Sequence, residues 1–280
     1  MAMQESSPLT SVSTLVAMHR AHIILSEVCY AVGDLNLDEY SLLLCASQNE
    51  QGTSAKRLKE DFSFYLGDAA FLSQSVVQKE LAVFVRNVSD RRGRALRITR
   101  KGITRLTLVD EAMVLSLMNA SETITQASIE YLIDYCRYTV FPSDLKSYVD
   151  TIIPYEFALM VCRYRAALIR SSACVGLSSL HAVILLLVDV SSRATSVFEL
   201  VQWLRIPEPL LLPQLEFLEE RRLLEETVTG AFELGEEGIS RIDAFVKKSN
   251  DSVQEFVRDY TEDERDRFGE LCRYCDYLFQ

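Results

Sequence analysis

The sequence predicts a mainly α-helical protein with small β-hairpins, of the α+β class, built as two similar halves. Three observations lead to this prediction. Long stretches place apolar residues at the three- and four-residue spacing of amphipathic helices. One basic segment alternates apolar and polar residues beside an Arg-Gly pair, as β-hairpins do. Segments of the first half also recur in the second half at nearly constant offsets.

The composition is that of a soluble globular protein with room for two ordinary domains. The chain has 280 residues, of which 49% are hydrophobic and 25% are charged. Its first ten residues lack the basic start and apolar core of a signal peptide, and no apolar run reaches the ~20 residues of a membrane span. We therefore expect a cytoplasmic protein that does not bind membranes. The seven cysteines are scattered and odd in number, which favours reduced thiols.

Charge is divided unevenly along the chain, whose net charge is −11. Residues 1–140 carry 14 basic and 16 acidic side chains, and residues 141–280 carry 15 and 24. Only the first half has a local basic cluster that could approach a polyanion. The cluster lies in Val85–Leu106 (VRNVSDRRGRALRITRKGITRL), where Asp90 alone opposes eight basic residues: Arg86, Arg91, Arg92, Arg94, Arg97, Arg100, Lys101 and Arg105.

Helices are expected before this basic segment. Leu9–Val32 has apolar residues at helical spacing and is followed by Gly33, a typical helix end. Asp38 is the expected N-cap of a second helix, and Ser54 that of a short third helix. A further helix is expected from about Asp68 to Val83.

The basic segment and the residues after it complete the first half. We expect a hairpin with its charges at the tip, followed by two amphipathic helices, about Ile103–Met118 and Glu122–Tyr138. Ser121 is the expected N-cap of the second of these helices. Helices, then a hairpin, then two more helices is the order of a winged-helix domain with dimerising arms.

Two pairs of segments indicate an internal duplication. Leu96–Leu106 (LRITRKGITRL) is echoed by Phe232–Ile242 (FELGEEGISRI) at an offset of 136, and Thr53–Phe62 (TSAKRLKEDF) by Thr195–Leu204 (TSVFELVQWL) at an offset of 142. The second copy is therefore about six residues shorter between these anchors, and a shortened hairpin is the simplest explanation. We place the domain boundary near residue 140, which gives domains 1–140 (the first copy) and 141–280 (the second copy).

Each copy is expected to begin and end with helices. The entry helix of the second copy is predicted at about Tyr155–Ala173. Through these terminal helices, tandem winged helix-turn-helix domains would form an intramolecular pseudo-dimer.

The chain resembles the MarR family of bacterial winged-helix regulators. In the first copy, the motifs that carry the resemblance are LNLDEYSLLLCAS, TSAKRLKEDF and the wing SDRRGRALRITRKGITRL, with its Asp-Arg-Arg and Thr-x-x-Gly elements. In the second copy, residues 177–226 have the helix-turn-helix cadence of the family but no Asp-Arg-Arg wing. The resemblance implies a dimeric arrangement that presents recognition helices and wings to double-stranded DNA. It also implies a pocket for a small-molecule effector, and leaves open a monomeric pseudo-dimer or a homodimer of it.

The candidate DNA-binding residues lie in the first copy. Arg91 and Arg92 at the wing tip would follow a minor groove, with Asp90 steering one of them. The recognition-helix positions, which the resemblance supplies, offer hydrogen bonds to the major groove. The remaining basic positions would meet phosphates. The full set is Lys56, Ser73, Gln74, Ser75, Gln78, Lys79, Arg86, Asp90, Arg91, Arg92, Arg94 and Arg97.

The second copy is expected to have lost direct DNA contact. Its counterpart of the recognition helix begins with Pro207, Glu208 and Pro209, and Pro213 restricts it further. From Arg221 to Arg241 there are three basic and five acidic residues, so phosphates would repel this wing.

Other chemistry finds little support in the sequence. His19 and His22 share a helix face without further ligands, and Cys272 and Cys275 form a lone CxxC, so core packing is favoured over a metal or redox site. No phosphate loop or nucleophile motif occurs, so we expect neither an enzyme nor a cofactor. The sequence thus predicts a MarR-like transcriptional regulator that contacts DNA mainly through its first winged helix. The alternative is a non-DNA-binding pseudo-dimer that binds proteins or senses a ligand.

Overall fold

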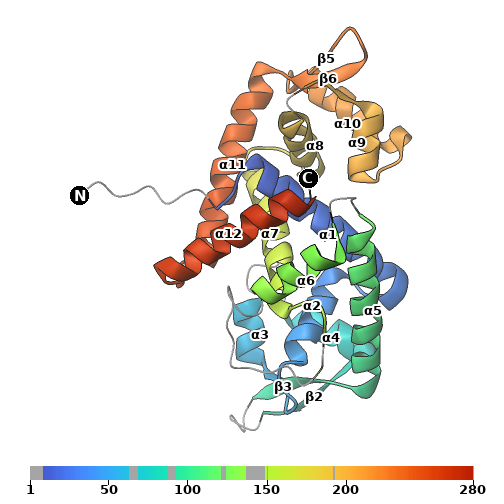
Figure 1. The fold of residues 1–280 in the computed structure, drawn as a ribbon, viewed down its shortest axis with the longest axis vertical. Coiled ribbons are helices and arrows are strands. Elements are labelled where there is room, and N and C mark those ends of the chain that lie inside the picture. Colours follow the sequence, from blue (N-terminus) through green and yellow to red (C-terminus); the bar gives the residue numbers. More distant parts are fainter. Residues whose placement is uncertain are drawn as a thin grey trace, which may run out of the picture. The chain divides into compact units, whose positions relative to one another are not determined.

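The computed structural model describes residues 9–62, 69–87, 93–120, 124–136, 149, 151–191 and 193–279 (Figure 1). Within them the chain is mainly helical with two small antiparallel sheets, which confirms the predicted mixture of helices and hairpins. The seven cysteines are free thiols, the state that their number and spacing predict.

The chain divides into two compact units. The middle unit is Ala21–Ala166, and the terminal unit combines Met1–Arg20 with Ala167–Gln280. The long helices α1 (Val12–Gly33) and α7 (Tyr155–Cys174) each contribute residues to both units. The compact units therefore do not coincide with the two sequence copies, whose boundary near residue 140 stays a prediction.

The middle unit holds the three-stranded sheet of the first copy, in the order β1-β3-β2. Two helices come directly before the hairpin strands in the chain, and two come directly after them (Figure 1). Besides parts of α1 and α7, its elements are α2 (Leu37–Ala46), β1 (Thr53–Ser54), α3 (Ala55–Asp61), α4 (Ala69–Gln78), β2 (Ala82–Arg86), β3 (Arg94–Ile98), α5 (Arg100–Met118) and α6 (Gln126–Asp134).

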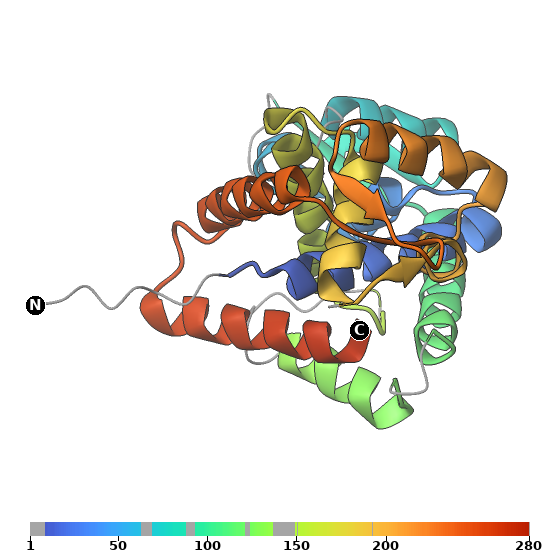
Figure 2. The ribbon, with the colours of Figure 1, turned by 90° about the horizontal axis from the view of Figure 1, so that it is seen from above.

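The terminal unit repeats this order of elements around a second sheet, β4-β6-β5. In both views the chain turns back between the last two helices (Figure 2). The elements are α8 (Ser179–Val190), β4 (Thr195–Ser196), α9 (Val197–Leu204), α10 (Glu208–Glu220), β5 (Leu224–Glu226), β6 (Ala231–Leu234), α11 (Glu236–Phe256) and α12 (Glu262–Phe279).

The segments that repeat in the sequence take the same places in the two sheets. Thr53 pairs with Leu96 across β1 and β3, and Thr195 pairs with Phe232 across β4 and β6. These four residues are the ones related by the offsets of 142 and 136. The repeated sequence segments thus correspond to a repeated backbone arrangement, called the backbone frame below.

The Gly and Arg that both copies keep support this frame. A Cβ on Gly102 would lie 2.0 Å from the Leu81 carbonyl oxygen, and one on Gly238 would lie 2.1 Å from that of Leu223. Only glycine lets α5 approach the Leu81 backbone, and α11 the Leu223 backbone, so closely. Arg105 donates to the Gly33 carbonyl oxygen at the end of α1 (2.8 Å), and Arg241 does the same after α7. Arg105 is therefore a helix cap rather than a member of the basic surface.

Several predicted element ends need correction. The helix expected at Asp68–Val83 ends at Gln78, because Glu80 adopts a left-handed conformation (φ 62°) and β2 begins at Ala82. The N-cap of α2 is Asn36 instead of Asp38, since Asn36 exchanges hydrogen bonds with Glu39 in a capping box. Ser54 caps α3 as predicted. Thr125 caps α6, and Ser121 lies outside the described residues.

Among the described helices, α1 is the one that length and apolar composition alone would allow to cross a membrane, contrary to the expectation that no such stretch exists. α7 and α8 reach that criterion together, with a bend of 100° between them. Half of the most apolar window of α1 is buried within the protein, as in the core helix of a soluble protein. The fold is compatible with a soluble protein, and the cytoplasmic location stays a prediction.

Candidate nucleic-acid interface

Helix α4 presents one exposed stripe and one buried side. Phe71, Gln74 and Gln78 are all exposed and share a face, because residues three and four apart are neighbours on a helix. Phe71 is 67% exposed, although it is a large apolar residue that the sequence analysis did not single out. This stripe is the part of α4 that another molecule can reach.

Ser73, Ser75 and Lys79 do not belong to the exposed stripe. Ser73 is 4% exposed and donates to the Ala69 carbonyl oxygen (2.7 Å), so the folded surface does not offer it for the base contact that was expected of it. Ser75 donates to Glu39 Oε1, and Lys79 Nζ lies 3.0 Å from Glu39 Oε2. Lys79 also donates to the Asp34 carbonyl oxygen at 2.6 Å. Ser75 and Lys79 therefore attach α4 to α2. In the predicted interface, their role would be to hold α4 in position.

Glu39 is the residue that sequence reasoning missed here. Its side chain is only 4% exposed, yet it caps α2 through Asn36 and receives both Ser75 and Lys79 from α4. A buried carboxylate needs such partners, because its charge is otherwise costly. The signal in the sequence was the Asn-x-x-Glu spacing of a capping box, which identifies the cap but not the partners on α4.

Removing Lys79 should loosen this attachment. Lys79→Met leaves the buried Glu39 carboxylate without its cation, and we expect the free energy of unfolding to fall by about 1–3 kcal/mol. Lys101→Met is the control, since its ion pair with Glu80 (2.7 Å) lies on the surface and should matter little. Urea unfolding of both variants measures the difference. Equal stability of the two variants would contradict a structural role for the Lys79–Glu39 pair.

The hairpin strands β2 and β3 carry three exposed arginines. Arg86 and Arg94 stand directly opposite each other in the register, and both are exposed. The register therefore places two cationic side chains next to each other on one face of the hairpin. The Arg94 guanidinium also lies over the Phe84 ring, 5.9 Å from its centre. Arg97 is exposed but pairs with Val83, so the pleat directs it to the other face of the hairpin.

The remaining predicted residues divide into one that is described and three that are not. Lys56 lies in the first turn of α3 with its side chain 85% exposed, and its ion pair with Glu60 at 3.8 Å is too exposed to hold it. Asp90, Arg91 and Arg92, the predicted wing tip, lie outside the described residues. The exposed members of the candidate interface are thus Lys56, Gln74, Gln78, Arg86, Arg94 and Arg97.

The second copy has different side chains at the equivalent exposed positions. Gln74 and Gln78 correspond to Glu216 and Glu220, Lys56 to Phe198, and Arg97 to Glu233. All four of these counterparts are exposed. Pro213 lies inside α10 without ending it, five residues after the helix begins. The same backbone frame therefore carries an acidic and apolar surface in the terminal unit.

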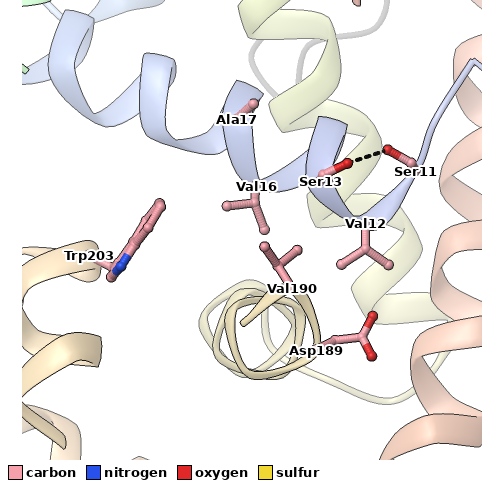
Figure 3. Close-up of a pocket in the computed structure, with 8 residues that line it drawn as sticks. All are labelled: Ser11, Val12, Ser13, Val16, Ala17, Asp189, Val190 and Trp203. Carbon is pink, nitrogen blue, oxygen red and sulfur yellow. Dashed lines mark hydrogen bonds between the residues drawn. The ribbon is translucent and has the colours of Figure 1, made fainter. Parts of the chain in front are cut away.

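A pocket of about 540 Å³ opens within the terminal unit (Figure 3). It lies among the start of α1, the end of α8 and Trp203 of α9, and its volume suits a small organic molecule. Burial, and then the nearby Asp243, raise the pKa of Asp189 above its ordinary value. The Arg20 guanidinium stacks on Trp203, 4.6 Å from the ring centre. The full lining is Ser11, Val12, Ser13, Val16, Ala17, Asp189, Val190 and Trp203.

The histidines considered in the sequence, His19 and His22, are half-buried, and the two cysteines are buried. His22 is within hydrogen-bond distance of Ser26 (3.3 Å), and Cys272 and Cys275 are both buried. No group of three or more metal-ligating side chains occurs among the residues that the structure describes.

Comparison with known proteins adds no relative. No protein-family model matches the chain, and no curated protein matches it significantly.

Proposed function

We propose that the protein is a DNA-binding transcriptional regulator of MarR-like type, in which two winged helix-turn-helix copies form a pseudo-dimer within one chain. In this proposal, α3 and α4 are the helix-turn-helix of the first copy and β2–β3 is its wing. The observation that carries the proposal is the directly opposed pair Arg86 and Arg94 on strands that follow the exposed stripe of α4.

The proposed contacts divide by chemistry. Gln74 and Gln78 can donate and accept hydrogen bonds, as side chains that reach base edges do. Arg86, Arg94 and Lys56 would bind phosphates, which position a protein on the duplex without reading its sequence. Arg97, on the other face of the hairpin, would meet a phosphate farther along the backbone. Phe71 could pack against a thymine methyl group at the start of the stripe.

Salt dependence is the direct test of this proposal. Binding to duplex fragments from upstream of the protein's own gene would be followed by fluorescence anisotropy between about 50 and 200 mM salt. Each neutralised phosphate contributes a slope of about −0.9 in log affinity against log salt. Arg86→Gln with Arg94→Gln should therefore flatten the slope by about two and weaken binding at least roughly tenfold.

The matched control removes two exposed arginines elsewhere. Arg258→Gln with Arg273→Gln changes the net charge equally, but Arg258 lies in the turn between α11 and α12 and Arg273 in α12, both outside the candidate interface. We expect this variant to keep nearly the wild-type slope. Absence of salt-dependent binding, or an equal loss in the control, would refute the regulator proposal.

The pocket favours a second candidate function, a ligand-sensing pseudo-dimer without DNA binding. Trp203 is the only tryptophan in the chain and lines the pocket, so its fluorescence reports on ligand entry. Titration with small aromatic amines and acids should quench this fluorescence in a saturable way if the pocket is a sensor site. Saturable quenching without any duplex binding would favour this second function, and no saturation with any compound would exclude it.

A further inference from the structure

The face of the second copy that corresponds to the candidate interface exposes large apolar side chains. Phe198 on α9 is 70% exposed, and Leu210 and Leu212 near the start of α10 are 63% and 39% exposed. α9 and α10 pack on each other as consecutive helices. Exposed apolar groups on adjacent helices are typical of a protein-docking surface.

Exposed carboxylates outnumber the exposed arginines (Arg205, Arg221 and Arg222) between the start of α9 and the end of β6. Glu216 and Glu220 lie on the same stripe of α10, and the strand register places Glu225 directly opposite Glu233. Two like charges in that position destabilise the hairpin unless a cation comes between them. The surface is therefore suited to a basic partner that also has apolar groups.

The first copy of the chain has a surface with both properties. The strands of its hairpin expose Arg86, Arg94 and Arg97, and Phe84 on β2 (41%) and Phe71 on α4 (67%) are exposed as well. Arg97 and Glu233 occupy equivalent positions in the two hairpins, so one scaffold presents opposite charges. Complementary charge of this kind speeds encounter and selects the partner.

We propose that the acidic face of the second copy (Phe198, Leu212, Glu216, Glu220, Glu233) docks on the first copy of another molecule of this chain. The docking site there comprises Phe71 of α4 and the basic hairpin, with Phe84, Arg86 and Arg94 on one side and Arg97 on the other, and is called the basic face. The two faces differ, so the contact is heterologous: two molecules can close into a pair with two such contacts, or many can extend into a chain. The acidic face occupies the arginines that a duplex would use, so self-association and DNA binding compete. This competition rests on the proposed function, whereas the docking itself does not.

Sedimentation of three variants tests the docking. The acidic-face variant carries Glu216→Gln, Glu220→Gln and Glu233→Gln, and the basic-face variant carries Arg86→Gln, Arg94→Gln and Arg97→Gln. The control removes three exposed carboxylates of α11–α12 and the turn between them, by Glu255→Gln, Asp259→Asn and Asp263→Asn. Wild type should self-associate at low salt and less so at high salt, because salt screens exposed charges. Each face variant should associate at least roughly tenfold more weakly than wild type, and the control should not.

Mixing the two face variants gives the sharpest result. The acidic-face variant keeps its basic face, and the basic-face variant keeps its acidic face, so the mixture should form a one-to-one complex that neither variant forms alone. A monomeric wild type, an equal loss in the control, or no complex in the mixture would overturn the proposal. A wild type that stays monomeric yet binds some other basic protein would overturn it as well.

Duplex binding separates this inference from the proposed function. With both correct, the acidic-face variant binds duplex at least as tightly as wild type, and more tightly at protein concentrations where wild type associates. Self-association with the predicted mixing result but without duplex binding would refute the proposed function alone. Duplex binding by a monomeric wild type would refute the docking alone.

Discussion

Asp110→Ala is expected to lower the free energy of unfolding by about 3–5 kcal/mol. Asp110 is 1% exposed on α5, and its carboxylate accepts hydrogen bonds from the Tyr40 hydroxyl (3.0 Å) and the amides of Ile152 (2.5 Å) and Ile153 (2.8 Å). Truncation leaves three donors without their acceptor, and each buried donor costs about 1–3 kcal/mol before the site relaxes. Urea unfolding followed by far-UV circular dichroism measures the loss.

Two companion variants show whether the carboxylate is the reason. Tyr40→Phe removes one donor and should cost about 1 kcal/mol, because the carboxylate keeps its two backbone partners. In the double variant, the losses should be less than additive, since both changes remove the same hydrogen bond. A loss for Asp110→Ala no larger than that for Tyr40→Phe would show that Asp110 does not anchor the segment around Ile152.

Gly102→Ala is the second change with a large expected effect, a loss of about 2–4 kcal/mol. The new methyl group would meet the Leu81 carbonyl oxygen at 2.0 Å, and a backbone atom cannot turn aside as a side chain can. Gly238→Ala should produce a comparable loss in the terminal unit, where the Leu223 carbonyl oxygen takes the same place. Thermal and urea unfolding of the two variants measure the effect in each unit.

Gly269→Ala is the matched control for these glycines. Gly269 lies inside α12, and its added methyl group would meet its neighbours at an ordinary 3.6 Å. Alanine is the better helix former, so this variant should gain about 0.5–1 kcal/mol. If Gly102→Ala shifted stability in the same direction, close packing of α5 on Leu81 would not explain why both copies keep this glycine.

Local signals in the sequence predicted the parts of the fold that depend on near neighbours. Ser54 caps its helix through a residue three positions away, and the repeated Gly and Arg were visible because the chain contains two copies. The end of α4 was not predicted, since it depends on the left-handed backbone of Glu80, a residue type that gives no such signal. The N-cap of α2 is Asn36, two residues before the predicted Asp38, because Asn36 exchanges hydrogen bonds with Glu39.

The exposed arginines on β2 and β3 were predictable from the sequence, but the exposure of the individual residues of α4 was not. The basic segment and its place after a helix pair pointed to β2–β3 and α4. Which residues of α4 face outward depends on what packs beneath, and Ser73 fell on the inner side. The contact of Lys79 with Glu39 joins residues 40 positions apart in the chain, and no local pattern reports a pair at that separation.

The sharing of α1 and α7 between the two compact units has a consequence for how this gene can change. Residues up to Arg20 belong with the second half of the chain, and residues up to Ala166 belong with the first. A truncation or recombination near residue 140 would thus divide both units at once and leave no intact fragment. Each compact unit thus needs residues from both halves of the sequence, so neither half is expected to fold into an intact unit on its own.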